Sequence, residues 1–549
     1  IGTNGLDTNE DTGFCDVVGL TYTPFIGSTE RISAICGYHS AYFDTSLLTP
    51  DWTTILPTPQ GRIFTPAQNN QFVFATALSQ LIATNNVDVP SQWSGGATSP
   101  WTDVSFSGLT NPIQRAKTVR FFRNFLVFGN TREAGVSYPT RVRWSNVGTI
   151  NTWTNADNTD VDAPAGQELN CMGELYGDLY LGFTSSLYRM SFVGGSNTFT
   201  FTKVSDSVGC IAKNSMQPVT LQNAQTGLVF LDRASRVYFF NGTAPVEISS
   251  LIHGTLDGLN FSRLPFAVSA EDGEHYYLCL TGSGATANNT CVDFHYYTGE
   301  WSVHRYGVNL NAMAKVVDST GRTQVFAGST DSFVYQLTNT SLDNDVGGAS
   351  GTIEAVSNYV GLTESSLQVI YDADQSFTIS GLVGAPLELV GGTASGLTAV
   401  IVDNTATGLV VNASFSTTPD ATTTYQVGAV DAFYTTKWYD LGAPAHIKQD
   451  GELYLWADAD IGSTLDVGYA FDFQSNTAVP TASLTPAEGS LWGTGLWGTA
   501  VWGGGSIVFR NLPLQDDGRY VRYNFAEDDV SENFRLHGYS TIYREGDIR

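Results

Sequence analysis

The sequence predicts an all-β protein, in which a β-propeller of six or seven blades is followed by a C-terminal β-sandwich-like domain carrying an inserted small β module. Its composition is the first reason: among 549 residues there are 56 Gly, 31 Phe, 25 Tyr and 11 Trp, and only 14% are charged. Glycine suits turns and aromatic side chains suit pleated sheets. The second reason is that helical periodicity is nearly absent, whereas short apolar runs split by polar residues are typical of paired strands.

The third reason is a repeat of hairpin-like units, each an apolar run, a small or polar break and a second apolar run. A strand repeat of about 40 to 50 residues is typical of a propeller. A pair of β-sandwiches would also give short strands at regular spacing, but it offers no reason for this long period. The anchor residues, separated by 39, 54, 53, 49, 48 and 48 positions, are Ile35, Phe74, Phe128, Leu181, Phe230, Leu278 and Phe326.

The order of the segments predicts the domain boundaries. Residues 1–20 are polar and Gly-rich, as expected of an N-terminal arm that a partner orders. Residues 21–345 hold the repeat and form the predicted propeller. A Gly/Ser/Asn-rich linker, Thr338–Gly351, follows it.

Residues 346–367 and 429–549 are predicted to form the C-terminal β domain, a platform for docking, with its first strand at Ile353–Val360. Residues 368–428 are rich in Thr, Val and Gly and contain no His, Lys or Arg. We therefore expect them to form a small β module inserted into that domain.

Three tryptophans near the end of the chain, Trp492, Trp497 and Trp502, recur every five residues, and each is followed by Gly. This spacing fits neither a strand nor a helix, so it predicts an ordered loop. Because Trp side chains commonly anchor interfaces, we predict that these three lie in a seam between domains or subunits. The alternative is that the rings stack on sugars or bases.

The charge balance limits the possible partners. With 53 acidic residues against 26 Lys and Arg, the formal net charge is −27, and no basic cluster stands out. Such a surface repels phosphates and anionic lipids, so tight nucleic-acid binding is not expected. An acidic lining would suit a conduit along which DNA slides without being held. The absence of an 18-residue apolar run predicts no membrane span.

No motif for catalysis, cofactor binding or metal binding is found. The seven histidines show no HxxxH or HExxH spacing, and nucleophile elbows, P-loops and dinucleotide fingerprints are absent. The sequence does not exclude the pair of catalytic carboxylates that a glycosidase needs, because it does not show which of the 53 acidic residues lie close together in space. The acidic segment 155–162 lacks the Gly and Glu of an EF-hand and is expected to be a solvated loop.

The six cysteines are dispersed without a CxxC pair, so we predict mainly buried free thiols. Cys279 and Cys291 flank one predicted hairpin. They could be bonded to each other in an oxidising compartment.

A series of segments extends over the larger part of the chain: 141–146, 175–190, 204–212, 227–232, 237–242, 245–249 and 534–549. Taken in order, they resemble the tail nozzle, or tail hub, of short-tailed bacteriophages. The resemblance implies a non-enzymatic virion structural protein, assembled in the host cytoplasm and located in the tail. It further implies a homohexamer, docked to a tail adaptor ring and carrying tail fibre or spike proteins, through whose lumen genome DNA is ejected without specific binding. The alternative is a glycan-binding or capsule-degrading phage tail protein.

Overall fold

The computed structural model describes the two parts of the chain separately, Ile1–Asn339 with Gly361–Glu364, and Thr340–Val360 with Ser365–Arg549. The residues described are 16–26, 29–36, 39–44, 52–55, 64–65, 67–96, 99–195, 198–221, 224–306, 308–317, 321–330, 333–337, 349–358, 367–379, 382, 385–412, 415–428, 432–459, 464–474, 477–478, 482–483, 507–514, 516–527 and 534–548.

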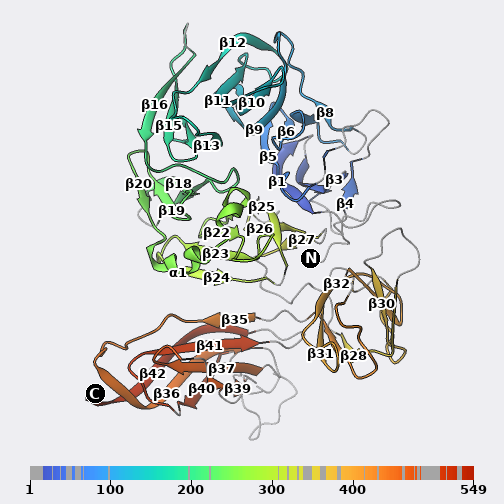
Figure 1. Ribbon diagram of the computed structural model, residues 1–549, viewed down its shortest axis with the longest axis vertical. Coiled ribbons are helices and arrows are strands. Elements are labelled where there is room, and N and C mark those ends of the chain that lie inside the picture. The colour runs from blue at the N-terminus through green and yellow to red at the C-terminus, as the bar shows by residue number, and fades with distance from the viewer. Residues whose placement is uncertain are drawn as a thin grey trace, which may run out of the picture. The chain divides into compact units, whose positions relative to one another are not determined.

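The first part is a seven-bladed β-propeller, whose antiparallel sheets follow one another around a ring (Figure 1). Within the described residues, six blades have four strands and the seventh has three. Blade one consists of β1 (Val17–Ile26), β2 (Thr29–Cys36), β3 (His39–Asp44) and β4 (Trp52–Thr54). Blade two consists of β5 (Val73–Ala77), β6 (Gln80–Thr84), β7 (Ser91–Trp93) and β8 (Thr102–Asp103). Blade three consists of β9 (Ile113–Phe122), β10 (Phe125–Glu133), β11 (Val136–Ser145) and β12 (Trp153–Asp160).

Blade four consists of β13 (Leu169–Leu175), β14 (Asp178–Phe183), β15 (Leu187–Phe192) and β16 (Phe199–Ser205), and blade five of β17 (Gln217–Thr220), β18 (Thr226–Leu231), β19 (Val237–Phe240) and β20 (Pro245–Glu247). Blade six consists of β21 (Val268–Glu271), β22 (His275–Leu280), β23 (Thr290–His295) and β24 (Trp301–His304). Blade seven consists of β25 (Leu310–Val317), β26 (Thr323–Ser329) and β27 (Val334–Gln336). The short helices η1 (Ser250–Ile252), α1 (His253–Asp257) and η2 (Phe261–Phe266) connect the fifth blade to the sixth.

The ring closes by packing of the first blade on the last. Strand β1 lies against β25, and one apolar cluster joins Val17 and Leu20 to Ala312 and Ala314. Among the described residues, each blade consists of consecutive strands. The structure also corrects the predicted arm, because Val17–Leu20 belongs to this innermost strand.

Alternating side chains let each blade pack on two neighbours. In blade four, Met172 and Leu181 join the apolar cluster shared with blade three, whereas Cys171 and Tyr180 join the cluster shared with blade five. This two-residue period follows from the pleat of a strand. Where blades approach closely, glycine is required: a Cβ at Gly129 of blade three would lie 2.5 Å from the Leu169 side chain of blade four.

The small module is larger than the sequence predicted. Its seven strands are ordered β28-β34-β31-β32-β33-β30-β29, so both strands near residues 346–367 belong to it and not to the C-terminal domain. The cause is long-range pairing, since Ser350 pairs with Gln426, and Ile353 is buried in the module core with Ile370. The strands are β28 (Ala349–Thr352), β29 (Ala355–Asn358), β30 (Gln368–Tyr371), β31 (Pro386–Gly391), β32 (Thr398–Asn404), β33 (Gly408–Val411) and β34 (Thr424–Val427).

The C-terminal domain consists of two sheets that share one core, as a sandwich does. Leu453 and Leu455 from one sheet pack with Val467, Tyr523 and Phe525 from the other. The strands of one sheet follow the order β35-β41-β37-β38, and β39 also pairs with β37. The strands of the other sheet follow the order β40-β36-β42. The strands are β35 (Ala432–Thr435), β36 (His446–Ala459), β37 (Thr464–Phe471), β38 (Thr477–Ala478), β39 (Ala482–Ser483), β40 (Ile507–Pro513), β41 (Val521–Glu527) and β42 (Phe534–Ile548).

Candidate functional site

The tryptophans predicted to form an interface, Trp492, Trp497 and Trp502, lie outside the described residues. Their role therefore stays a prediction. In the propeller, the structure brings polar and charged groups together at three places: the outer part of blade three, the edge of blade six and the propeller axis.

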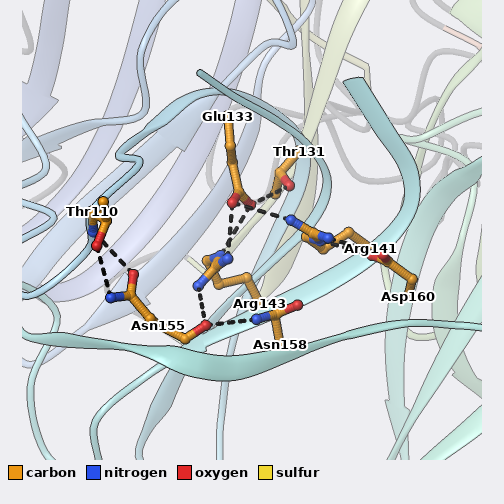
Figure 2. A network of polar contacts seen from close by, with 8 residues as sticks. All are labelled: Thr110, Thr131, Glu133, Arg141, Arg143, Asn155, Asn158 and Asp160. Atoms are coloured by element: carbon orange, nitrogen blue, oxygen red, sulfur yellow. Dashed lines mark hydrogen bonds and ion pairs between the residues drawn. The ribbon is translucent and has the colours of Figure 1, made fainter. Parts of the chain in front are cut away.

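On blade three, the acidic segment expected to be a solvated loop is instead the outer strand β12. Its Asp160 lies opposite Arg141 of β11 and binds that guanidinium through two hydrogen bonds, of 2.7 and 2.9 Å (Figure 2). The hydrogen bonds that Arg141 donates to Asp160 raise the pKa of Arg141 above its ordinary value, in spite of partial burial. The ring of Tyr138 packs under the same guanidinium, 3.5 Å from its central carbon.

The centre of this network is Glu133, which is only 3% exposed. Arg143 binds it with two hydrogen bonds of 3.0 and 2.8 Å, Arg141 adds one of 3.2 Å, and the Thr131 hydroxyl adds one of 2.8 Å (Figure 2). All of these contacts lie within blade three, and those of Arg141 and Arg143 join β11 to β10. Glu133 and Asp160 are thus paired with arginine, and the network stabilises the blade.

On blade six, Glu274, His275 and His295 place ligand atoms within 4.8 Å of one another. His275 and His295 lie opposite each other on β22 and β23, and the Nδ1 of His275 is 2.8 Å from the Asp293 carboxylate. This hydrogen bond raises the pKa of His275, although burial opposes it. Burial by itself would raise the pKa of Asp293, but the hydrogen bonds from His275 and His304 bring it below its usual value.

The hydrogen bonds of His295 argue against a metal ion at this cluster. Its Nδ1 accepts from the main-chain N–H groups of Tyr297 and Thr298, both at 3.2 Å. An imidazole whose Nδ1 accepts carries its proton on Nε2, so neither nitrogen has a lone pair free for a metal. The cluster is better described as a histidine–aspartate ion-pair system at a blade edge.

The third place is a cavity of about 200 Å³ on the propeller axis, partly open to solvent. Its walls come from the innermost strands or their leading residues in six of the seven blades. Of the described residues that line it, Arg120, Lys213 and Lys315 are basic and none is acidic. This is unexpected in a chain of net charge −27.

Lys213 is 9% exposed, and its ammonium donates hydrogen bonds to the main-chain carbonyls of Gln71 and, at 3.4 Å, Asn85. Burial, together with the nearby charge of Lys117, lowers the pKa of Lys213 to about 7. Arg120 donates to the carbonyls of Met172 and Phe74, at 2.9 and 3.3 Å. Lys315, in contrast, is paired with Glu271 at 2.6 Å.

Polar contacts also cross the axis beside this cavity. The Gln71 amide, just before β5, donates to the main-chain carbonyl of Phe266, just before β21, and to the side-chain oxygen of Asn311 on β25, at 2.8 and 3.0 Å. Asn214, just before β17, donates to the carbonyl of Phe72 at 3.2 Å. Blade two is therefore tied to blades five, six and seven, and the axis is narrowed at this level.

The three basic residues of the cavity were not predicted from the sequence, in which no cluster of basic residues stands out. They stand far apart in the chain and meet only because the inner strands surround one axis. A usable signal was present: Arg120 and Lys315 each stand between two apolar residues of an inner strand, Val119 and Phe121 in β9 and Ala314 and Val316 in β25.

The cysteines differ partly from expectation. Cys171, Cys210, Cys279 and Cys291, hereafter the four free cysteines, are buried thiols. Cys279 and Cys291 face each other across β22 and β23 without being bonded. Cys36 is not a free thiol but takes part in a disulfide. Burial is the main cause that raises the pKa of the Cys291 thiol.

Among the described residues, no helix has the length and apolar character needed to cross a membrane. This agrees with the sequence, in which no apolar run of that length was found.

No family model matches the chain, and no curated protein matches it. Similar solved structures include YCF48 from Cyanidioschyzon merolae (12% identity, TM-score 0.34, 60% of this chain and 96% of that one). The N-terminal domain of Nup159 has 11% identity and a TM-score of 0.32 over 59% of this chain and 89% of that one. An exo-β-1,3-galactanase from Phanerochaete chrysosporium has 10% identity and a TM-score of 0.27 over 86% of this chain and 97% of that one.

Proposed function

We propose that the chain is a virion structural protein, the subunit of a ring-shaped tail nozzle or hub through which genome DNA leaves a short-tailed bacteriophage. In this proposal six copies form the ring, one end docks on a tail adaptor ring, and tail fibre or spike proteins attach to it. The chain performs no catalysis. The protein is located in the virion tail, after assembly in the host cytoplasm.

The observation that carries the proposal is the architecture in chain order: a seven-bladed propeller, a small β module and a two-sheet β domain. The segments that resemble nozzle proteins occupy defined parts of it. Segment 175–190 forms the hairpin of β14 and β15, segments 227–232 and 237–242 contain the central hairpin of blade five, and segment 534–549 contains β42. The resemblance therefore extends from the propeller into the last domain.

The narrowed propeller axis supports a passage between copies of the chain. A cavity of about 200 Å³, crossed by the hydrogen bonds of Gln71, has no room for a duplex to pass. A polymer would thus have to run through a lumen that several copies enclose. The net charge of −27 suits such a lumen, because a predominantly acidic wall repels phosphates and does not hold the DNA.

The polar clusters of the propeller support a structural role over an enzymatic one. Glu133 is occupied by two arginines, and Asp293 is hydrogen-bonded by histidine. In each case the titratable groups are bound to one another within a single blade. Interactions of this type stabilise a scaffold.

The mass of the purified full-length protein tests the proposal. Native mass spectrometry should show a closed assembly of six chains, and the protein should leave capsular polysaccharide of its host unchanged. A trimer or a monomer that cleaves polysaccharide would favour the capsule-degrading alternative instead. The tryptophan run provides an internal check: Ala at positions 492, 497 and 502 should shift the population towards monomers if these side chains lie in a subunit interface. The same change at an exposed aromatic residue of the propeller, Tyr297, should not shift it.

A further inference from the structure

We infer that the cavity on the propeller axis binds a small oxyanion, a phosphate-like or carboxylate group, through Lys213 and Arg120. This site is separate from the proposed lumen between subunits. The inference does not depend on the proposed function, since it concerns the interior of one propeller.

The first argument is the charge of the cavity. Three basic side chains and no acidic one line it among the described residues. Lys315 is neutralised by Glu271, but neither Arg120 nor Lys213 lies within ion-pair distance of a carboxylate in the described part of the chain. Burial lowers the pKa of Arg120, and Cys171 and the exposed Glu174 offset this only in part.

The second argument is the supply of hydrogen-bond donors. An ammonium has three N–H groups and a guanidinium has five. Lys213 uses two on main-chain carbonyls, one of them at 3.4 Å, and Arg120 likewise makes two such bonds. Four donors on two cations thus remain for a ligand in the cavity. An oxyanion accepts several such bonds at once, and these are stronger than bonds between neutral groups.

The third argument is energetic. A buried charge is costly unless an opposite charge accompanies it, and main-chain carbonyls supply only partial negative charge. For Lys213 the cost is visible in its pKa, which burial and the charge of Lys117 lower to about 7. Lys117 is itself paired with Glu168 at 2.8 Å, so that carboxylate is already engaged. An anion between Lys213 and Arg120 would supply the missing counter-charge.

The size of the cavity limits the ligand to small molecules. A space of about 200 Å³ holds an oxyanion with a few further atoms, and it excludes nucleic-acid strands. Neighbouring polar side chains are already engaged: Asn214 donates to Phe72, and Gln217 donates to Ser269. Recognition would therefore depend on the two cations.

Calorimetric titration of the full-length protein at constant ionic strength tests this inference. Sulfate should bind saturably with one site per chain at pH 6. Because sulfate keeps its charge between pH 6 and 8.5 whereas Lys213 loses its proton, the affinity should fall about tenfold or more over that range. Phosphate and acetate, titrated in parallel at pH 6, distinguish a tetrahedral oxyanion from a carboxylate.

Two variants complete the test. Lys213→Met should abolish sulfate binding, whereas Arg236→Gln, which removes one positive charge from a surface ion pair with Asp257, should leave it unchanged. Absence of saturable binding in the wild-type protein at pH 6 would overturn the inference, as would equal affinity of the two variants. If Lys213→Met fails to fold, the pH series of the wild-type protein decides: an affinity that does not change with pH contradicts the role of Lys213.

Discussion

Replacing Glu133 by Gln should destabilise the propeller more than the loss of a surface ion pair would. The carboxylate accepts four hydrogen bonds, three of them from the guanidinium groups of Arg141 and Arg143. An amide keeps one acceptor oxygen and turns an NH₂ donor towards the guanidinium groups, so charge-assisted bonds worth about 1.5–3 kcal/mol each are lost. Leaving buried arginine without its partner costs about 3–5 kcal/mol in total.

The matched control is Asp160→Asn in the same network. The Asp160 side chain is 51% exposed, so its ion pair with Arg141 is screened by water and should contribute no more than about 1 kcal/mol. The assay is denaturant unfolding followed by tryptophan fluorescence, because Trp144 and Trp153 are buried in the same blade. Equal losses of unfolding free energy for the two variants would refute the reasoning that burial determines the contribution of these ion pairs.

Three further predictions concern other parts of the propeller. An NMR titration should give His275 a pKa above its ordinary value, and Asp293→Asn should lower it; the stability from this pair is therefore fully present below the unfolded pKa of about 6.5 and is lost as pH rises through the raised folded value. If the pKa of His275 is the same in the variant, the pairing is wrong. Gly209→Ala should lower the melting temperature strongly, because its Cβ would lie 2.1 Å from the Phe183 carbonyl oxygen, whereas Gly254→Ala, with nothing within 4 Å in α1, should raise the stability by about 0.5–1 kcal/mol. The four free cysteines should react with a maleimide only after unfolding, since they are buried; rapid labelling of the native protein would contradict this.

The repeat made the propeller predictable, because each blade is built from neighbouring strands joined by short turns. Anchor residues such as Phe128, Leu181 and Phe230 all lie in the second strand of a blade and are fully buried. Local sequence therefore contained most of the information about the blades. The choice between six and seven blades required the packing of β1 on β25, which no local pattern reveals.

The errors have a common physical cause in long-range contacts. The pairing of Ser350 with Gln426 assigns β28 to the small module, although their segments are far apart in the chain. The polar segment 155–162 contains few apolar residues, yet most of it forms an outer strand, because Arg141 and Arg143 supply partners that apolar packing does not. The axial cavity was missed for the same reason, since Arg120 and Lys213 come from different blades.

The central claim is that copies of this chain enclose a conduit, and a single-particle electron microscopy reconstruction of the assembled protein tests it most directly. The account predicts a closed ring of six subunits, each with a seven-bladed propeller whose own axis is blocked, around a central lumen with a predominantly acidic wall. A three-fold spike, a monomer, or a ring whose lumen is lined by basic side chains would contradict it.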